Sequence, residues 1–162
     1  MSKYLIYFFT FNYLLTGCET ASVIKEYEPA NEQIYIDVVQ KNLNLEGSTE
    51  GPYSQKVKKS LQKWLEDSIK TSGYDGELDI ELLSIKTSEK ILENSVRIEM
   101  SLELNFIIAN QVLSKKRSKL IKVNEFGKLT GSFSLDDKDT EVNNIIKRLL
   151  QRLGQIIAKE VI

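Results

Sequence analysis

The sequence predicts an α+β fold, a two-layer sandwich in which about four mostly antiparallel strands form one sheet and two helices cover one face. Three observations carry this prediction. Hydrophobic residues occupy alternate positions throughout 96–108, which is typical of a strand with one buried face. Two other segments, 53–69 and 142–161, repeat their hydrophobic residues at helical spacing. The order of all these segments along the chain is β-α-β-β-β-α.

The first strand is predicted at 33–39, where three β-branched residues alternate with polar or amphipathic neighbours. Residues 42–51 are rich in Asn, Gly, Ser and Thr and are predicted to form a loop. Pro52 suits the first turn of a helix because its missing N–H costs no hydrogen bond there. That helix is expected to stop at Gly73. Its hydrophobic stripe consists of Tyr53, Val57, Leu61, Trp64, Leu65 and Ile69.

Three extended segments follow the first helix. The first is predicted at 78–82, the second at 96–108, and a less regular third at 112–133. Asn94 and residues 110–111 mark the turns, which favours antiparallel pairing of consecutive strands. The polar face of the second segment carries Arg97, Glu99, Ser101, Glu103 and Asn105. Two aromatic residues near the end of the sheet are expected to pack in the core, with contact to acyl chains as the alternative. They are Phe126 and Phe133.

Asp139 or Thr140 is expected to cap the last helix, and Glu141 in its first turn would interact favourably with the helix dipole. The hydrophobic stripe that follows is broad and extends through 142–161. Gly154 lies within this stripe and should cost about 1 kcal/mol relative to alanine. A close approach between this helix and the sheet would explain the glycine.

The N-terminus has the order of a secretory signal: Lys3 is followed by a mostly apolar run at 4–15 and then by small residues. A transmembrane helix needs roughly 20 apolar residues, which is more than this run offers. The tetrapeptide Leu-Thr-Gly-Cys at 15–18 resembles the lipobox, at which bacteria attach lipid to the cysteine and cut just before it. The sequence therefore predicts a lipid on Cys18. An ordinary secretory signal with an unmodified cysteine, or a buried N-terminal helix, remains the alternative.

These features divide the chain into three parts. Residues 1–17 are predicted to be the lipoprotein signal peptide. Residues 18–32 are predicted to form the lipidated N-terminus and a tether, because they are small, polar and charged and include Pro29. Residues 33–162 are long enough for a single α+β domain with one core.

Composition argues against an enzyme. The chain has no histidine, which removes the commonest general base and most zinc sites. Its one cysteine is assigned to lipid, which leaves neither a thiol nucleophile nor a pair for an intramolecular disulfide. The 22 basic and 23 acidic side chains give a net charge of −1, without the basic surplus that nucleic-acid binders carry. No catalytic residues, cofactor, metal site or nucleic-acid partner are expected.

One cluster of cations falls at or after the predicted turn that follows the long strand. Such a cluster can bind the phosphates of lipid A or of phospholipid headgroups. Lysines also commonly protect an exposed strand edge from pairing with another chain. Both interpretations remain open at this stage. The cluster consists of Lys115, Lys116, Arg117, Lys119 and Lys122.

The lipobox, the order of elements and the mature length together resemble the lipopolysaccharide-assembly lipoprotein family. The stretch that carries most of this resemblance is Ser-Val-Arg-Ile-Glu-Met-Ser-Leu-Glu-Leu-Asn-Phe at 95–106, followed by the Lys-rich segment and the helix at 140–161. The resemblance implies a lipid-anchored protein on the periplasmic face of the outer membrane. It also implies that the protein binds and supports a β-barrel partner, contacts lipopolysaccharide and has no catalytic activity.

In that family, basic residues before the long strand and before the last helix are thought to meet lipopolysaccharide. Lys90 and Lys138 stand at comparable places here, so the resemblance implies this role for them. Glu19, after the cysteine, is not the aspartate that retains many enterobacterial lipoproteins in the inner membrane. The alternative is an auxiliary lipoprotein of an ABC-type lipid transport system, or another envelope-assembly lipoprotein, since such proteins share these patterns.

Overall fold

The structure, a computed structural model, describes residues 33–110 and 115–161. The predicted signal peptide, Cys18 and the predicted tether therefore lie outside the described residues. The elements in chain order are β1 (Ile34–Ile36), β2 (Gln40–Asn44), β3 (Ser48–Glu50), α1 (Ser54–Ser68), β4 (Ile69–Thr71), β5 (Glu77–Leu92), β6 (Ser95–Asn110), β7 (Lys115–Thr130) and α2 (Leu135–Glu160).

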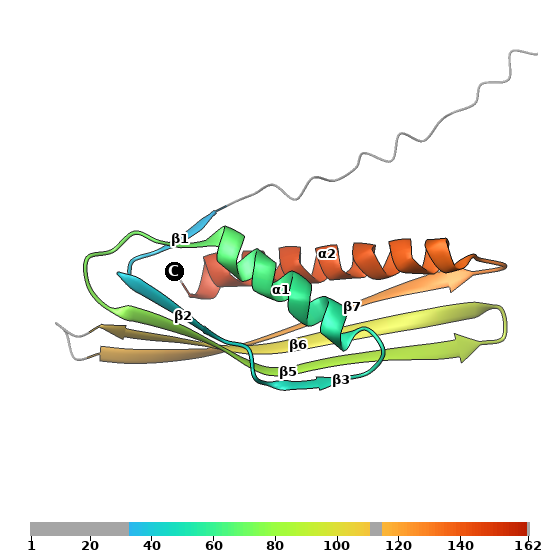
Figure 1. The fold of residues 1–162 in the computed structure, drawn as a ribbon, viewed down its shortest axis with the longest axis horizontal. Helices are drawn as coiled ribbons and strands as arrows, with labels where there is room; N and C mark the ends of the chain where they lie inside the picture. Colours follow the sequence, from blue (N-terminus) through green and yellow to red (C-terminus); the bar gives the residue numbers. More distant parts are fainter. Residues whose placement is uncertain (1–32, 111–114, 162) are drawn as a thin grey trace, which may run out of the picture.

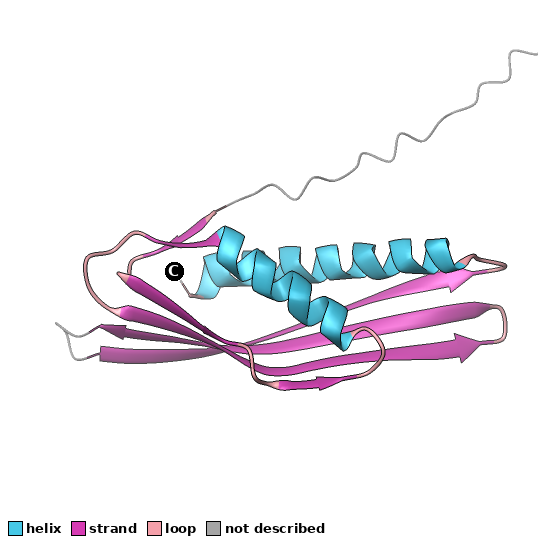
Figure 2. Ribbon diagram, viewed as in Figure 1, coloured by secondary structure: helices cyan, strands magenta, loops and turns pink. Residues whose placement is uncertain are grey.

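The described elements form an α+β fold, in which both helices lie on one face of a five-stranded sheet (Figures 1 and 2). The long strands β5, β6 and β7 pair antiparallel in sequence order. The short strands β2 and β3 follow one another along the free side of β5 and run parallel to it. β1 and β4 form a separate parallel pair. The predicted α+β class and two helices are confirmed, whereas the four-stranded description is corrected to this larger, mixed sheet.

The first predicted strand and the loop after it required the largest correction. The strand expected at 33–39 ends at Ile36, and the predicted loop at 42–51 contains most of β2 and all of β3. Both strands join the sheet through backbone pairing with β5, and five of their eight residues are exposed. Because backbone pairing does not depend on side-chain type, a polar segment can form an edge strand without strong hydrophobic alternation.

Each helix has one end that differs from the prediction. α1 ends at Ser68 and not at Gly73, because the next residues pair with β1 as strand β4. α2 begins earlier than expected, since its N-cap is Ser134 and not Asp139 or Thr140. Ser134 Oγ accepts a 3.1 Å hydrogen bond from the Asp137 backbone N–H, and Asp137 accepts one of 2.8 Å from the Ser134 backbone. This reciprocal pair is a capping box, which satisfies two N–H groups that otherwise lack partners.

The core lies between the helices and the sheet. The alternation predicted for the long strand is confirmed, because its inward residues from Val96 to Phe106 are each 7% exposed or less. They pack in one hydrophobic cluster with α1 and α2, and each such side chain contributes about 1.5–3 kcal/mol when fully buried. The turn predicted at Asn94 is also confirmed, since residues 93–94 join β5 to β6.

Gly154 marks a close contact of α2, although not with the main sheet. A Cβ atom added to Gly154 would lie 3.2 Å from Trp64 Cζ2 on α1 and 3.8 Å from Ile34 Cδ1 on β1. The expected close approach of helix to sheet is therefore corrected to an approach between α2, α1 and the first described strand.

Candidate functional site

The basic cluster lies on β7, the edge strand of the main sheet within the described part of the chain. The first five residues of β7 are all exposed. Lys119 Nζ lies 2.7 Å from Glu160 Oε2 and Lys122 Nζ lies 2.9 Å from Glu103 Oε1. Lys115, Lys116 and Arg117 form no such ion pair with the described residues, so three cations remain available at this edge.

This basic end of β7 lies at the same end of the molecule as the first described strand (Figure 1). The C-terminal part of α2 connects the two, because it holds Lys119 through Glu160 and places Gly154 next to Ile34. Lys119 of β7 and Ile34 of β1 therefore both lie against the C-terminal part of α2.

Lys138 belongs to the first turn of α2, not to the segment before the helix, and its ammonium group is engaged. Its Nζ donates a 2.7 Å hydrogen bond to Glu89 Oε1 on β5. Tyr53, at the N-cap of α1, donates a 2.6 Å hydrogen bond to the other oxygen of Glu89. The Lys138 and Glu89 side chains are only 25% and 21% exposed. These three residues form a half-buried cluster that we call the Glu89 cluster.

Hydrogen bonding sets the protonation states in the Glu89 cluster. The hydrogen bond from Lys138, followed by that from Tyr53, lowers the pKa of Glu89. The same bond to Glu89 raises the pKa of Lys138. Burial, followed by the hydrogen bond to Glu89, raises the pKa of Tyr53. Each shift moves a pKa away from neutrality, so this arrangement stabilises a charged pair and does not favour proton transfer near pH 7.

The structure does not bring Lys90 and Lys138 together. Glu89 faces the helices, and because successive side chains of a strand point to opposite faces, Lys90 points to the other side of the sheet. Lys90 is 60% exposed, and its Nζ lies 3.3 Å from Glu99 Oε2. The two predicted lipopolysaccharide contacts therefore stand on opposite faces, where one ligand group cannot bridge them directly.

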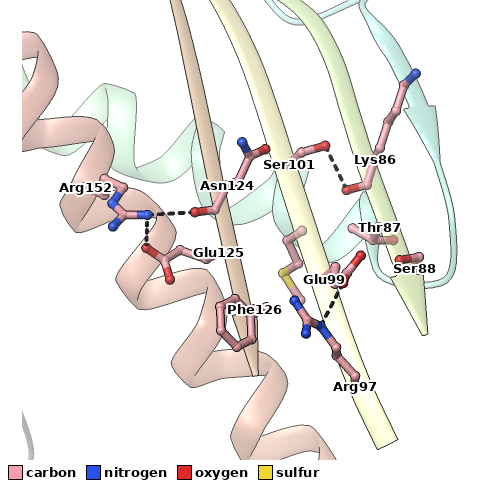
Figure 3. A pocket seen from close by; sticks show the side chains of 11 residues that line it. Lys86, Thr87, Ser88, Arg97, Glu99, Ser101, Asn124, Glu125, Phe126 and Arg152 are labelled. Carbon is pink, nitrogen blue, oxygen red and sulfur yellow. Dashed lines mark hydrogen bonds and ion pairs between the residues drawn. The ribbon is translucent and has the colours of Figure 1, made fainter. Parts of the chain in front are cut away.

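The face of the sheet opposite the helices, which we call the open face, contains a cavity of about 580 Å³. Figure 3 shows the Arg97 guanidinium there between Phe126 and Glu99. Its central carbon lies 4.4 Å from the Phe126 ring centroid, and Nε lies 2.7 Å from Glu99 Oε1. At the rim, Arg152 Nη1 lies 2.9 Å from Glu125 Oε1. The lining residues are Lys86, Thr87, Ser88, Arg97, Glu99, Met100, Ser101, Asn124, Glu125, Phe126 and Arg152.

The sequence did not predict this cavity. Phe126 was expected to pack in the core, with contact to acyl chains as the alternative, but its side chain is 56% exposed on the open face. Phe133, for which the expectation was the same, packs against the core in part. The register explains the error: Phe126 is opposite Glu99, on the polar face of β6. The signal that could have found it is the phase of β7, in which Ile121 and Val123 face the core and even-numbered residues face away.

Over 33–110 and 115–161, no three acidic or cysteine side chains come together in a way that could hold a metal ion. Neither of the two described helices is both long enough and apolar enough to cross a membrane.

No protein-family model matches the chain, and no curated protein matches its sequence. Solved structures that align with this chain include a neuraminyllactose-binding hemagglutinin homologue from Helicobacter pylori, at 13% identity over 81% of this chain and 89% of that one, with a TM-score of 0.47. A minor lipoprotein from Acinetobacter baumannii shows 11% identity, coverage of 76% and 91%, and a TM-score of 0.44. A Xanthomonas campestris protein of family DUF330 shows 13% identity over 80% of this chain and 86% of that one, with a TM-score of 0.44. Similarity this low transfers neither function nor residue roles.

Proposed function

We propose that the chain is a non-enzymatic lipoprotein, anchored through Cys18 on the periplasmic face of the outer membrane. In this role it binds and supports a β-barrel partner in lipopolysaccharide assembly and export. The observation that carries the proposal is the open face of the long antiparallel strands. Along β6, every side chain on this face from Arg97 to Asn105 is polar or charged, and each is partly exposed. Such a surface suits a hydrated protein lumen better than a lipid or an apolar groove.

The position of the basic edge supports contact with anionic lipid. Lys115, Lys116 and Arg117 lie at the end of the molecule where the described chain begins. A lipid on Cys18 would hold this end toward the membrane, and each cation near an anionic surface contributes about 1 kcal/mol. The absence of histidine from the sequence and the protonation states of the Glu89 cluster support a role without catalysis.

Site-specific crosslinking tests the barrel partner. A photoreactive residue at Asn105, on the open face, should crosslink in cells to one large outer-membrane barrel. The matched control carries the same residue at Gln62, which is exposed on the outer side of α1. Crosslinks to a barrel from Asn105 and none from Gln62 would support the proposal. Recovery of an ATPase and a permease would instead favour an auxiliary lipoprotein of an ABC-type lipid transporter.

A further inference from the structure

Three cations stand side by side across the open face. The register places Lys90 of β5 directly opposite Arg97 of β6, and Arg97 directly opposite Lys128 of β7. Like charges that face each other on neighbouring strands destabilise a sheet. This row of three is therefore unfavourable unless something compensates its charge.

The described residues compensate the row only in part. The carboxylate of Glu99 pairs with both neighbours: Oε2 lies 3.3 Å from Lys90 Nζ, and Oε1 lies 2.7 Å from Arg97 Nε. Lys128 is exposed and forms no ion pair with another described residue. Lys86, which lines the neighbouring cavity, likewise has no carboxylate partner in the described chain. Four cations thus share one carboxylate on this part of the surface.

The Arg97 guanidinium is held in place by two neighbours, and its terminal nitrogens face no acceptor among the described residues. Phe126 supports one face of its guanidinium, and Glu99 fixes the Nε edge. Nε itself is buried and lacks hydrogen-bond geometry, so Glu99 positions it through charge. The terminal nitrogens of Arg97 make no hydrogen bond with a described residue. They are the pair of donors that binds two oxygens of one oxyanion.

The cavity beside Arg97 is of a size and composition that suits a small molecule. Its volume of about 580 Å³ falls within the range of roughly 300–1,000 Å³ that ligand pockets occupy. Ser88, Ser101 and Asn124 supply hydroxyl and amide groups, and Phe126 supplies an apolar surface. Figure 3 shows that these side chains come from β5, β6 and β7 and surround one space.

We propose that this cavity binds a phosphate monoester, with the terminal nitrogens of Arg97 on the phosphate and Lys86, Lys90 and Lys128 supplying further charge. A phosphate monoester carries about −1.5 to −2 at neutral pH and offers three acceptor oxygens. Four cations and one carboxylate leave three positive charges, so a phosphate monoester neutralises more of this excess than a carboxylate, which would neutralise only one. The organic part of the ligand lies against Phe126, Ser101 and Asn124.

The proposal goes beyond a barrel-supporting role and holds whether or not the chain has a barrel partner. The phosphate monoester can belong to a free metabolite or to a lipid headgroup, because the chemistry at Arg97 is the same. Two arms of the experiment separate these sources. One arm uses glycerol 3-phosphate in solution, and the other uses phosphatidylcholine vesicles that contain phosphatidic acid.

Calorimetric titration of the full-length chain in detergent provides the first arm. Glycerol 3-phosphate should bind, whereas glycerol and acetate should bind at least tenfold more weakly. Arg97→Gln should weaken binding at least tenfold. Arg97→Lys should weaken it less, because lysine keeps the positive charge but lacks the paired donors of the guanidinium. Lys128→Gln, which removes an exposed side chain, should weaken binding about threefold. The control Lys122→Gln removes a cation of the same face that Glu103 already pairs, and should leave binding unchanged.

Flotation with vesicles provides the second arm, with the same variants. Binding in either arm that Arg97→Gln weakens at least tenfold supports the proposal, and the arm that responds identifies the source of the phosphate. The proposal is overturned if neither ligand binds the wild type. It is also overturned if Arg97→Gln and Lys122→Gln lose binding equally, since general charge attraction would then explain the effect.

Discussion

Lys138 on the first turn of α2 donates a 2.7 Å hydrogen bond to Glu89 on β5. In the sheet, β6 lies between β5 and the edge strand β7. The same carboxylate accepts a hydrogen bond from Tyr53 at the N-cap of α1. The N-terminal ends of both helices are therefore joined to one strand through a single anion. An anion is also favoured at this place because the helix dipoles are positive at their N-termini.

The Glu89 cluster predicts a specific dependence of stability on pH. Since the folded-state pKa of Glu89 is lowered from 4.5, its stabilisation is complete above the unfolded pKa and is lost as pH falls through the folded one. Lys138 behaves in the opposite sense, because its pKa is raised from 10.5. Its stabilisation is complete below the unfolded pKa and is lost as pH rises through the folded one.

We expect Glu89→Gln to lower the free energy of unfolding by about 1–2 kcal/mol at pH 7 and by clearly less at pH 3. Urea unfolding at the two pH values measures this difference. The control Glu46→Gln changes an exposed carboxylate and should have little effect at either pH. Equal losses for Glu89→Gln at pH 3 and pH 7 would show that its charge does not stabilise the fold.

Lys41 secures the C-terminal end of α1. Its Nζ donates hydrogen bonds of 2.8 Å and 2.7 Å to the carbonyl oxygens of Leu65 and Ile69 at this end. The Leu65 oxygen also accepts the backbone N–H of Ile69, the C-cap residue. Burial, with Lys70 nearby, lowers the pKa of Lys41. We expect Lys41→Met to lower the free energy of unfolding by about 1–2 kcal/mol. Lys63→Met, on the exposed side of α1, is the control in the same urea measurement, and equal losses would contradict the capping role.

The parts of the fold that were predictable are those whose side chains report burial directly. β6 has one face on the core and one on the open side, so its two-residue period was readable over 96–108. β2 and β3 carry no such period because they extend the sheet through backbone pairing. The end of α1 depends on β1, which is distant in sequence, whereas the capping box at Ser134 and Asp137 was local and was missed in favour of Asp139.

The candidate site was predictable only in part, for the same reason. The turn at residues 93–94 fixes the pairing of Lys90 with Arg97, so that half of the row could be derived from the sequence. The pairing of Arg97 with Lys128 depends on the length of the connection between β6 and β7, which composition does not determine. The hydrogen bond from Lys138 to Glu89 is a tertiary contact between residues 49 positions apart, and no sequence pattern predicts it.

Gly47 lies where β2 and β3 pass the bulge of β5, between Leu82 and Ser84. A Cβ atom at Gly47 would lie 2.1 Å from the Leu82 carbonyl oxygen, a backbone atom that cannot move independently. We expect Gly47→Ala to lower the free energy of unfolding by about 1–3 kcal/mol. The exposed neighbour Glu46→Ala should change it by less than about 0.5 kcal/mol. A thermal midpoint equal to that of Glu46→Ala would show that β5 can shift to admit the methyl group.

Cys18 is the predicted lipid attachment site. Cys18→Ala should abolish labelling by radioactive palmitate and release the protein from the membrane fraction. One acyl chain alone gives marginal membrane binding, so retention depends on the several chains that lipoprotein processing adds. The control is Cys18 intact with Thr20→Ala, a neighbouring change that leaves the lipobox resemblance unaltered. Palmitate on the Cys18→Ala protein would contradict the assignment.

The exposed cations at the start of β7 have two possible roles, and charge reversal separates them. If Lys115, Lys116 and Arg117 bind lipid phosphates, reversing all three to glutamate should weaken binding to phosphorylated lipid A by at least about 100-fold. This magnitude follows from about 1 kcal/mol per cation at an anionic surface. The matched control reverses three lysines of α1: Lys58, Lys59 and Lys63.

Edge protection predicts a different pattern, because glutamate also blocks strand pairing. In that case the reversed protein should stay monomeric and keep its affinity for lipid A. Replacement of the same three residues by threonine should then cause self-association, measured by light scattering. Loss of lipid A binding in both variants, with the protein monomeric throughout, would assign the cluster to anion binding. In that case the β7 edge does not pair with a second chain even without its positive charges.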